Sequence, residues 1–207
     1  MLTIEEARGH YAAADTAHDF DHVLRVWRLV QRIGPAEGAD MTVLQAATLL
    51  HDVARADELR VGLDHAAEGA RRAREILAGY PPTQVDAVAH AIAAHRFRGD
   101  VAPATQEARV LYDADKLDAL GAIGVARAYA IAGLLGQPLW TPPIPNQVAS
   151  RDNLSANHSP VREFAVKLGK LRDSLHTPTA RAIAQGRHEF MAAYFARLEQ
   201  EVLGVDS

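Results

Sequence analysis

The sequence predicts an all-α protein, and three observations support this fold class. Apolar residues recur at helical spacing along most of the 207-residue chain. No stretch alternates convincingly enough to predict a strand, and no internal repeat is found. Hydrophobic residues make up 48% of the chain, which is enough for a full core. The length then favours a single domain over residues 1–207.

Helix signals divide the first fifty residues into three segments. A capping-box pattern at residues 3–6 predicts a short opening helix. A helix over about 19–33 has one apolar face and is expected to end at Gly34-Pro35. The third helix begins at Asp40 or Thr42. Its sequence, MTVLQAATLLHDV, is almost entirely apolar, so we expect this helix to be central and buried.

The middle of the chain continues in the same way. A loop is expected around residues 57–64. Helices are expected over residues 65–80, 83–97 and 107–135. The last of these is long enough to contain a break, which Gly121 or Gly124 would supply. We expect the core of the domain to occupy about residues 19–135.

The composition changes between residues 136 and 160, where five prolines occur. Prolines at this density exclude a continuous helix and predict a long irregular loop. The loop is expected at the surface, either near the mouth of a site, at a subunit contact, or as a linker without a role. Helices over about 161–175 and 178–203 are expected to close the chain, so that the C-terminal helices span 161–203.

Bulk properties exclude several classes of protein. The chain has no cysteine, which excludes disulfides and thiolate ligands. The formal net charge is -4 and no long basic run occurs, so we expect no polymeric nucleic acid as a partner. No apolar stretch is long enough to span a membrane, and the N-terminus lacks a signal core. The expected location is cytoplasmic, and a homodimer is left open.

Four residues carry the strongest chemical signal. His22, the adjacent pair His51-Asp52, and Asp115 all lie in helix-forming sequence. Two imidazoles and two carboxylates are typical ligands of one divalent metal ion, with Mn²⁺ as the first candidate and Fe, Co, Ni, Zn or Mg as alternatives. Burying His51-Asp52 after an apolar helix is costly unless a partner compensates it. The alternative is a set of ordinary polar networks and helix caps.

The order H…HD…D resembles that of the HD-domain metal-dependent phosphohydrolases. FDHVLRVWRLV, LQAATLLHDVAR, DHAAEGARRAREIL, VAHAIAAHRF and DADKLDALGAIGVARA resemble the small stand-alone bacterial HD hydrolases, and so does the tail from EFAVKLGKLRDSLH onward. The resemblance covers about residues 19–201. It implies a helical bundle with a metal ion at its centre. It also implies a nucleotide phosphohydrolase activity, and some members of this subgroup cut deoxynucleoside triphosphates to the monophosphate and pyrophosphate.

The resemblance also bears on the residues around the metal. Dinuclear HD proteins have a histidine near the position of His65 and a later His-His pair, whereas here the pair reads His95-Arg96. Arginine stays protonated and is a poor ligand, so we expect one metal rather than two. The residues expected to bind the substrate phosphate are His65, His95, Arg96, Lys116 and His18. Asp52, His65 and His95 are the expected catalytic residues, with Asp52 orienting the attacking water.

Two other functions compete with the enzyme. A non-catalytic HD-fold module that binds a nucleotide for regulation would be expected to have lost metal ligands, and none is lost. A scaffold bundle would not bring its histidines together. The substrate is not defined by the sequence. Relatives that hydrolyse guanosine tetraphosphate are expected to carry an acidic pair after the HD motif, where this chain reads HDVARADE, so the resemblance disfavours that substrate. Relatives that hydrolyse cyclic dinucleotides carry a GYP segment where this chain reads RFRGD, so cyclic dinucleotides are disfavoured as well.

Overall fold

A computed structural model describes residues 2–11, 20–97, 99–142 and 158–205. The described residues form helices and contain no strand, which confirms the all-α prediction. The elements are α1 (Ile4–Arg8), α2 (Phe20–Ala36), α3 (Met41–Leu50), α4 (Arg55–Val61), α5 (His65–Ile76), α6 (Pro82–Ala93), α7 (Gln106–Asp118), α8 (Gly121–Leu134), α9 (Pro160–Val166), the 3-10 helix η2 (Leu168–Ser174) and α10 (Pro178–Leu203).

The chain divides into two compact units. The first comprises residues 1–116 and 176–180, and the second comprises residues 117–175 and 181–207. Two helices, α7 and α10, each continue from one unit into the other. The single-domain organisation over residues 1–207 therefore stays a prediction, and the two units are described separately.

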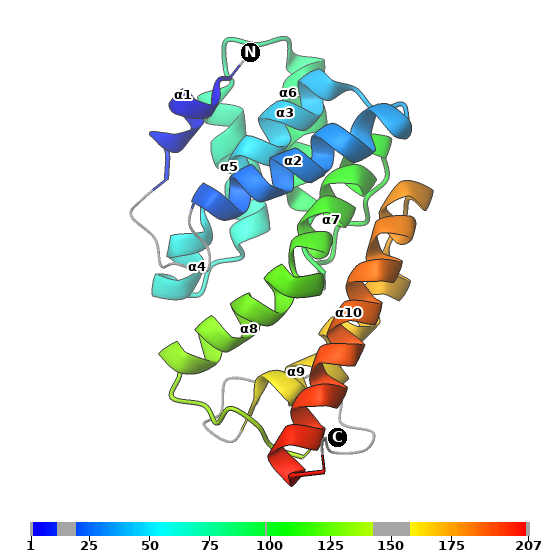
Figure 1. Ribbon diagram of the computed structural model, residues 1–207. Helices are drawn as coiled ribbons and strands as arrows, with labels where there is room; N and C mark the ends of the chain where they lie inside the picture. The colour runs from blue at the N-terminus through cyan, green and yellow to red at the C-terminus, as the bar shows by residue number, and fades with distance from the viewer. Residues whose placement is uncertain (1, 12–19, 98, 143–157, 206–207) are drawn as a thin grey trace. The chain divides into compact units, whose positions relative to one another are not determined.

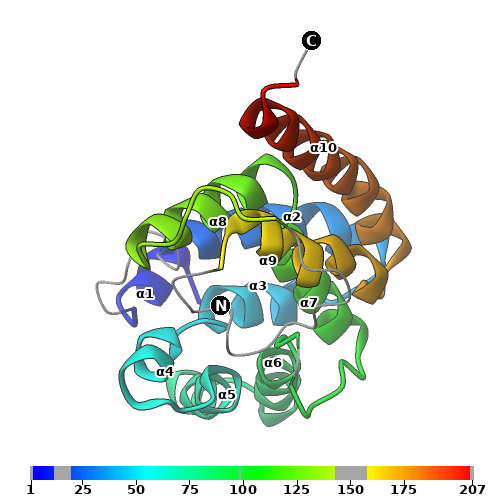
Figure 2. The same cartoon turned by 90° about the horizontal axis from the view of Figure 1, so that it is seen from below.

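Helix α3 forms the centre of the first unit, as its apolar sequence predicts. It packs against α2 on one side and α6 on another, and it also contacts α1 and α5 (Figures 1 and 2). Leu44, Ala47 and Leu50 are fully buried. Asp40 caps the start of the helix by accepting hydrogen bonds from the amides of residues 42 and 43. A buried helix of this kind fixes the position of whatever follows its C-terminal end.

Residues 176–180 return to the first unit through hydrogen bonds to two carboxylates. Asp113 on α7 is fully buried and accepts hydrogen bonds from the amides of His176 and Thr177, at 2.9 and 2.7 Å. Glu37 accepts a hydrogen bond from the amide of Thr179 at 2.8 Å. These contacts satisfy backbone donors at the start of α10, so the segment is fixed to the end of α7 that carries Asp115.

The expected end of the second helix at Gly34-Pro35 is wrong. Helix α2 continues through Pro35 to Ala36, and Gly38, with φ of 68°, follows it. The carbonyls of Ile33 and Gly34 accept hydrogen bonds from the amides of residues 37 and 39 at 3.0 Å each. A proline in the last turn removes only one donor, so it does not end the helix when the glycine that follows can supply the left-handed turn.

The expected loop over residues 57–64 is also wrong, because Arg55–Val61 forms α4. Two ion pairs at helical spacing, Arg55 with Glu58 and Arg60 with Asp57, stabilise this short helix. Its acidic residues lie in the first turn, where they interact favourably with the helix dipole. Gly62, with φ of 74°, ends it. Helix α6 is shorter than expected and ends at Ala93 rather than near residue 97.

In the second unit, the predicted break at Gly121 is confirmed. Gly121 has φ of 75°, and α8 begins there after the end of α7 at Asp118. The expected helix over 161–175 is instead two elements, α9 and η2, which meet at Lys167 (φ −135°, ψ −63°). Gly169 then approaches the Phe164 carbonyl so closely that a Cβ would lie 3.0 Å from it. The last helix has the predicted bounds, Pro178–Leu203.

Most of the proline-rich loop, residues 143–157, lies outside the described residues. Its expected role is therefore neither supported nor contradicted. Within the described part of the chain, no single helix is both long and apolar enough to cross a membrane. Only α7 and α8 taken together across their break reach that length and hydropathy.

Candidate metal centre

The His51-Asp52 pair lies at the end of α3, and the helix itself orients the imidazole. His51 is the C-cap residue and is fully buried. Its Nδ1 lies 2.8 Å from the carbonyl of Thr48, one turn earlier. Because a carbonyl can only accept, Nδ1 carries the proton and donates it to Thr48. The Nε2 atom of the neutral ring is then left with a lone pair that faces His22.

His95 repeats this arrangement at the end of α6. Its Nδ1 donates to the carbonyl of Ile92 at 2.6 Å, and the ring is buried. The Nε2 lone pair of His95 therefore also points into the site. Two helices thus present imidazoles in the same tautomer by the same local hydrogen bond, which is the orientation that metal-binding histidines adopt.

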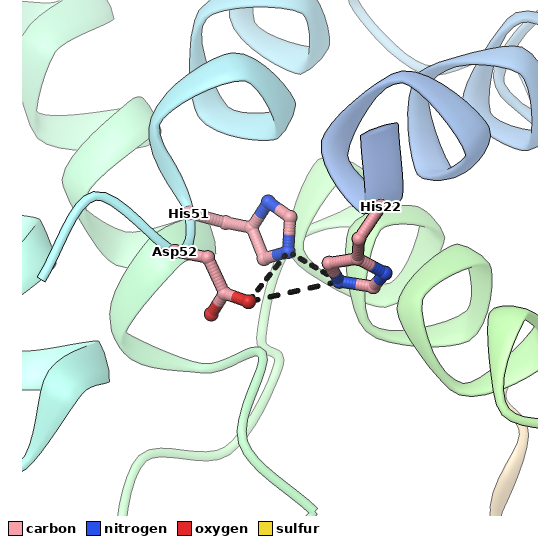
Figure 3. Close-up of side chains that lie close together, drawn as sticks. All are labelled: His22, His51 and Asp52. Atoms are coloured by element: carbon pink, nitrogen blue, oxygen red, sulfur yellow. Dashed lines mark hydrogen bonds and ion pairs between the residues drawn. The ribbon is translucent and has the colours of Figure 1, made fainter. Parts of the chain in front are cut away.

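The carboxylate of Asp52 lies between two pairs of imidazoles. Its Oδ2 is 3.6 Å from Nε2 of His22 and 3.8 Å from Nε2 of His51, and the two histidine nitrogens are 3.3 Å apart (Figure 3). Its Oδ1 is 3.7 Å from Nε2 of His65 and 3.6 Å from Nε2 of His95. Each pair together with Asp52 offers ligand atoms that all lie within 4.8 Å of one another.

Asp115 on α7 completes the side of the site that contains His22. Its Oδ1 lies 3.3 Å from Nε2 of His22. The adjacent Lys116 is buried and donates both to Asp115 and, at 2.9 Å, to the carbonyl of His95. An ammonium group has three donors, so one N–H of Lys116 is not used by these two contacts.

The protonation states of these groups suit a cation. Burial lowers the pKa of His51 to about 4, so its ring is neutral at pH 7. Burial alone would raise the pKa of Asp52, but the imidazoles of His51 and His95 outweigh it and hold that pKa well below its usual range. The pKa of Asp115 is likewise held well below its usual range, because Lys116 and His22 outweigh its burial.

The charge balance supports the same conclusion. Two carboxylates, the buried Asp52 and the partly exposed Asp115, lie at this site with the neutral ring of His51, and the ammonium group of the buried Lys116 pairs with Asp115. An uncompensated buried charge is costly, so a divalent ion fits this donor set. The residues that would hold it are those expected from the sequence, namely His22, His51, Asp52 and Asp115.

A charged rim adjoins the second pair of imidazoles. Nδ1 of His65 lies 2.8 Å from a carboxylate oxygen of Glu58 and 3.2 Å from a guanidinium nitrogen of Arg55. The same Glu58 pairs with Arg55 and, at 3.1 Å, with Arg96. Arg96 also pairs with Asp64, the N-cap residue of α5. Burial lowers the pKa of His65 to about 3, so this ring is also neutral at pH 7.

The expected substrate-binding residues differ in their position relative to the site and in their exposure. His65, His95 and Lys116 lie at the site and are buried, and Arg96 lies at its rim with 38% of its side chain exposed. His18 lies outside the described residues. Lys116 pairs with Asp115.

From the sequence, Glu58 was expected only as a residue that could act through water, and Arg55 was given no role. Glu58 lies six residues after Asp52 in the sequence. The direction of its side chain depends on α4, which was expected to be a loop. The signal that could have identified both residues is the spacing of three between Arg55 and Glu58, which predicts a helical ion pair.

Comparison with known proteins places the chain in a family. Residues 19–120 match the HD domain. The uncharacterized protein YpgQ of Bacillus subtilis is 33% identical over 199 residues, which cover 93% of this chain and 88% of YpgQ. The crystal structure of YpgQ in complex with ADP superposes with a TM-score of 0.72 at 32% identity, covering 99% of this chain and 100% of that chain.

Two further solved structures agree. An HD-superfamily hydrolase from Bacillus thuringiensis has a TM-score of 0.73 at 29% identity, covering 96% of this chain and 93% of that one. An HD superfamily hydrolase from an uncultured Thermotogales bacterium has a TM-score of 0.67 at 27% identity, covering 96% and 90% of the two chains. Together with the buried His and Asp cluster, these matches show that the chain is a member of the HD-domain family of metal-dependent phosphohydrolases.

Proposed function

We propose that the protein hydrolyses nucleotides, with (deoxy)nucleoside phosphates as substrates, and that it uses one divalent ion, Mn²⁺ first among the candidates. His22, His51, Asp52 and Asp115 would hold the ion. A bound ion of this kind lowers the pKa of water and polarises a phosphoryl oxygen. The observation that carries the proposal is the position of the Asp52 carboxylate, with one oxygen toward His22 and His51 and the other toward His65 and His95.

The residues on the second side then bind and orient the phosphate. The imidazoles of His65 and His95 are buried, and hydrogen bonds to phosphate are stronger in such an environment than in water. Arg96 at the rim can form the bidentate contact that guanidinium groups make with phosphate. Asp52 would orient the attacking water as well as hold the ion.

His65 can form hydrogen bonds in either neutral tautomer. Its Nδ1 has both an acceptor, Glu58, and a donor, Arg55, within 3.2 Å, so either neutral tautomer finds a partner. When Nδ1 donates to Glu58, the lone pair of Nε2 can accept a hydrogen bond from the attacking water. When Nδ1 instead accepts from Arg55, Nε2 carries the proton and can donate a hydrogen bond to a phosphate oxygen. This supports the assignment of His65 as a catalytic residue, with Glu58 positioning it.

The nucleotide class is supported by a relative. YpgQ, which this chain resembles along nearly its whole length, has been crystallised in complex with ADP. In this chain, the guanidinium groups of Arg55 and Arg96 beside His65 and His95 suit a phosphorylated ligand. Whether a monophosphate ester or an anhydride is cut depends on which phosphorus lies opposite Asp52, and the experiment below decides between them.

The test is a screen of nucleoside mono-, di- and triphosphates with the full chain and Mn²⁺, with phosphate and pyrophosphate both measured. Turnover that requires metal and is lost in Asp52→Ala supports the proposal. The alternative, a regulatory module that binds nucleotides without cutting them, predicts nucleotide binding with no product. Absence of both binding and turnover across the screen contradicts both functions.

A further inference from the structure

The N-terminal segment from Leu2 to Tyr11 runs along α3, the helix that ends at the HD pair. Near its start, the carbonyl of Leu2 accepts a hydrogen bond from Nε2 of Gln45 at 2.9 Å. At its end, the hydroxyl of Tyr11 donates to the carbonyl of Leu49 at 3.0 Å. Gln45 and Leu49 are four residues apart and so share one face of α3. The segment is therefore attached to α3 at two points one helical turn apart.

The attachment by Tyr11 lies close to the metal centre. Leu49 is only two residues before His51 and belongs to the last turn of α3, where helix carbonyls lack partners within the helix. Tyr11 supplies a donor to one of these carbonyls. The Tyr11 side chain is half-buried, and its desolvation and the nearby charge of Asp52 raise the pKa of Tyr11 well above its usual range, so the hydroxyl keeps its proton at pH 7.

Tyr11 also contacts the helix that carries His22. Its ring meets the ring of Phe20 edge to face, with centroids 5.1 Å apart and planes at 72°. Phe20 is the first residue of α2 and lies two residues before His22. The guanidinium of Arg8, from the same N-terminal segment, lies 4.4 Å from the centroid of the Phe20 ring. Tyr11 thus contacts the end of one ligand-bearing helix and the start of another.

We propose that Tyr11 is a positioning residue for the metal centre, an inference that rests on the proposed function. By holding the Leu49 carbonyl and the Phe20 ring together, it fixes the separation of α3 and α2 at the point where they present His51 and His22. The Nε2 atoms of these two histidines lie 3.3 Å apart, and a small relative movement of the helices would change that distance. The N-terminal segment, which carries no metal ligand, would therefore contribute to metal affinity.

The test compares two substitutions in the full-length, metal-free protein. Tyr11→Phe removes the hydrogen bond near the site and keeps the ring, whereas Gln45→Met removes the hydrogen bond at the other attachment point. Both variants lose one hydrogen bond, so both should lose a similar amount of stability. Affinity for Co²⁺ is measured by calorimetry, and the visible absorption of bound Co²⁺ reports the ligand geometry.

We expect Tyr11→Phe to bind Co²⁺ about tenfold more weakly and with an altered spectrum, at the low end of the loss seen when groups that orient metal ligands are removed. Gln45→Met should bind as the unsubstituted protein does. Equal affinity and spectrum in Tyr11→Phe, or an equal loss in Gln45→Met, would overturn the inference while leaving the metal site intact. If the unsubstituted protein binds no Co²⁺, the metal centre of the proposed function is wrong and the inference fails with it.

Discussion

Nδ1 of His65 lies 2.8 Å from a carboxylate oxygen of Glu58, and this contact connects the buried imidazoles to the charged rim of the site. Glu58 also pairs with Arg55 and Arg96, so one carboxylate holds two guanidinium groups and orients one imidazole. The Nε2 atom of His65 is thereby directed toward Asp52. A carboxylate behind a histidine is a common way to fix the orientation of the ring.

Glu58→Gln should lower turnover without removing the metal. The amide keeps the size of the side chain but loses the charge that holds both arginines and orients His65. We expect kcat/KM to fall by roughly 10–100-fold, with metal content unchanged by elemental analysis. Glu68→Gln is the matched control, because Glu68 also pairs with two arginines, Arg71 and Arg72. Full activity in Glu58→Gln, or an equal loss in Glu68→Gln, would contradict the assignment.

Asp52→Ala should abolish hydrolysis while the helices remain. The substitution removes the one carboxylate that lies between both pairs of imidazoles, so a metal ligand and the group that orients the water are lost together. Metal content and product formation should both fall to background, with unchanged far-UV circular dichroism. Asp86→Asn, at an exposed position on α6, serves as the control. Substantial turnover by Asp52→Ala at saturating Mn²⁺ would show that Asp52 has neither role.

The fold class and the central helix could be predicted because they depend on local patterns. The apolar run before His51 is sufficient to bury α3, and Asp40 is sufficient to cap it. The same reasoning explains why burying His51 and Asp52 pointed to a metal. These features require only the spacing of residues along one helix.

Other features depend on contacts that no local pattern contains. Tyr11 and Leu49 are 38 residues apart, and nothing in either neighbourhood predicts their hydrogen bond. The segment around residues 57–64 was expected to be a loop, and the ion pairs that stabilise α4, Arg55 with Glu58 and Arg60 with Asp57, form only once the chain is helical. Pro35 was expected to end α2, but the amides of residues 37 and 39 satisfy the carbonyls of the last turn.

His65→Ala and Arg96→Ala should weaken the use of substrate and leave the metal in place. If these side chains contact phosphate, KM rises while metal content stays near one ion per chain, the stoichiometry proposed above. His10→Ala, at an exposed histidine of the N-terminal segment, controls for the loss of an imidazole. His65 and His95 with Asp52 also form a group that could hold an ion. Two tightly bound ions in the unsubstituted protein, one of them lost in His65→Ala, would therefore replace the phosphate assignment with a dinuclear site.

The metal-free protein should lose stability as the pH falls from about 6.5 toward 4. Burial lowers the pKa of His51 from 6.5 to about 4 and that of His65 from 6.5 to about 3. Below pH 6.5 the unfolded chain binds these protons and the folded chain does not. The free energy of unfolding is therefore highest above pH 6.5 and decreases as the pH falls. At 1.36 kcal/mol per pKa unit, His51 alone accounts for a loss of about 3 kcal/mol over this range.

Urea unfolding at pH 7, 5.5 and 4.5 measures this loss directly. His65→Gln cannot take up the second proton, so its unfolding free energy should fall less steeply with pH than that of the unsubstituted protein. Saturating Mn²⁺ should make the dependence steeper, because an ion binds the neutral imidazoles and stabilises the folded state only while they remain unprotonated. An unfolding free energy that is the same at pH 7 and pH 5 in the metal-free protein would show that these histidines are not held neutral by the fold. Burial would then not be the reason that the imidazoles of His51 and His65 are neutral.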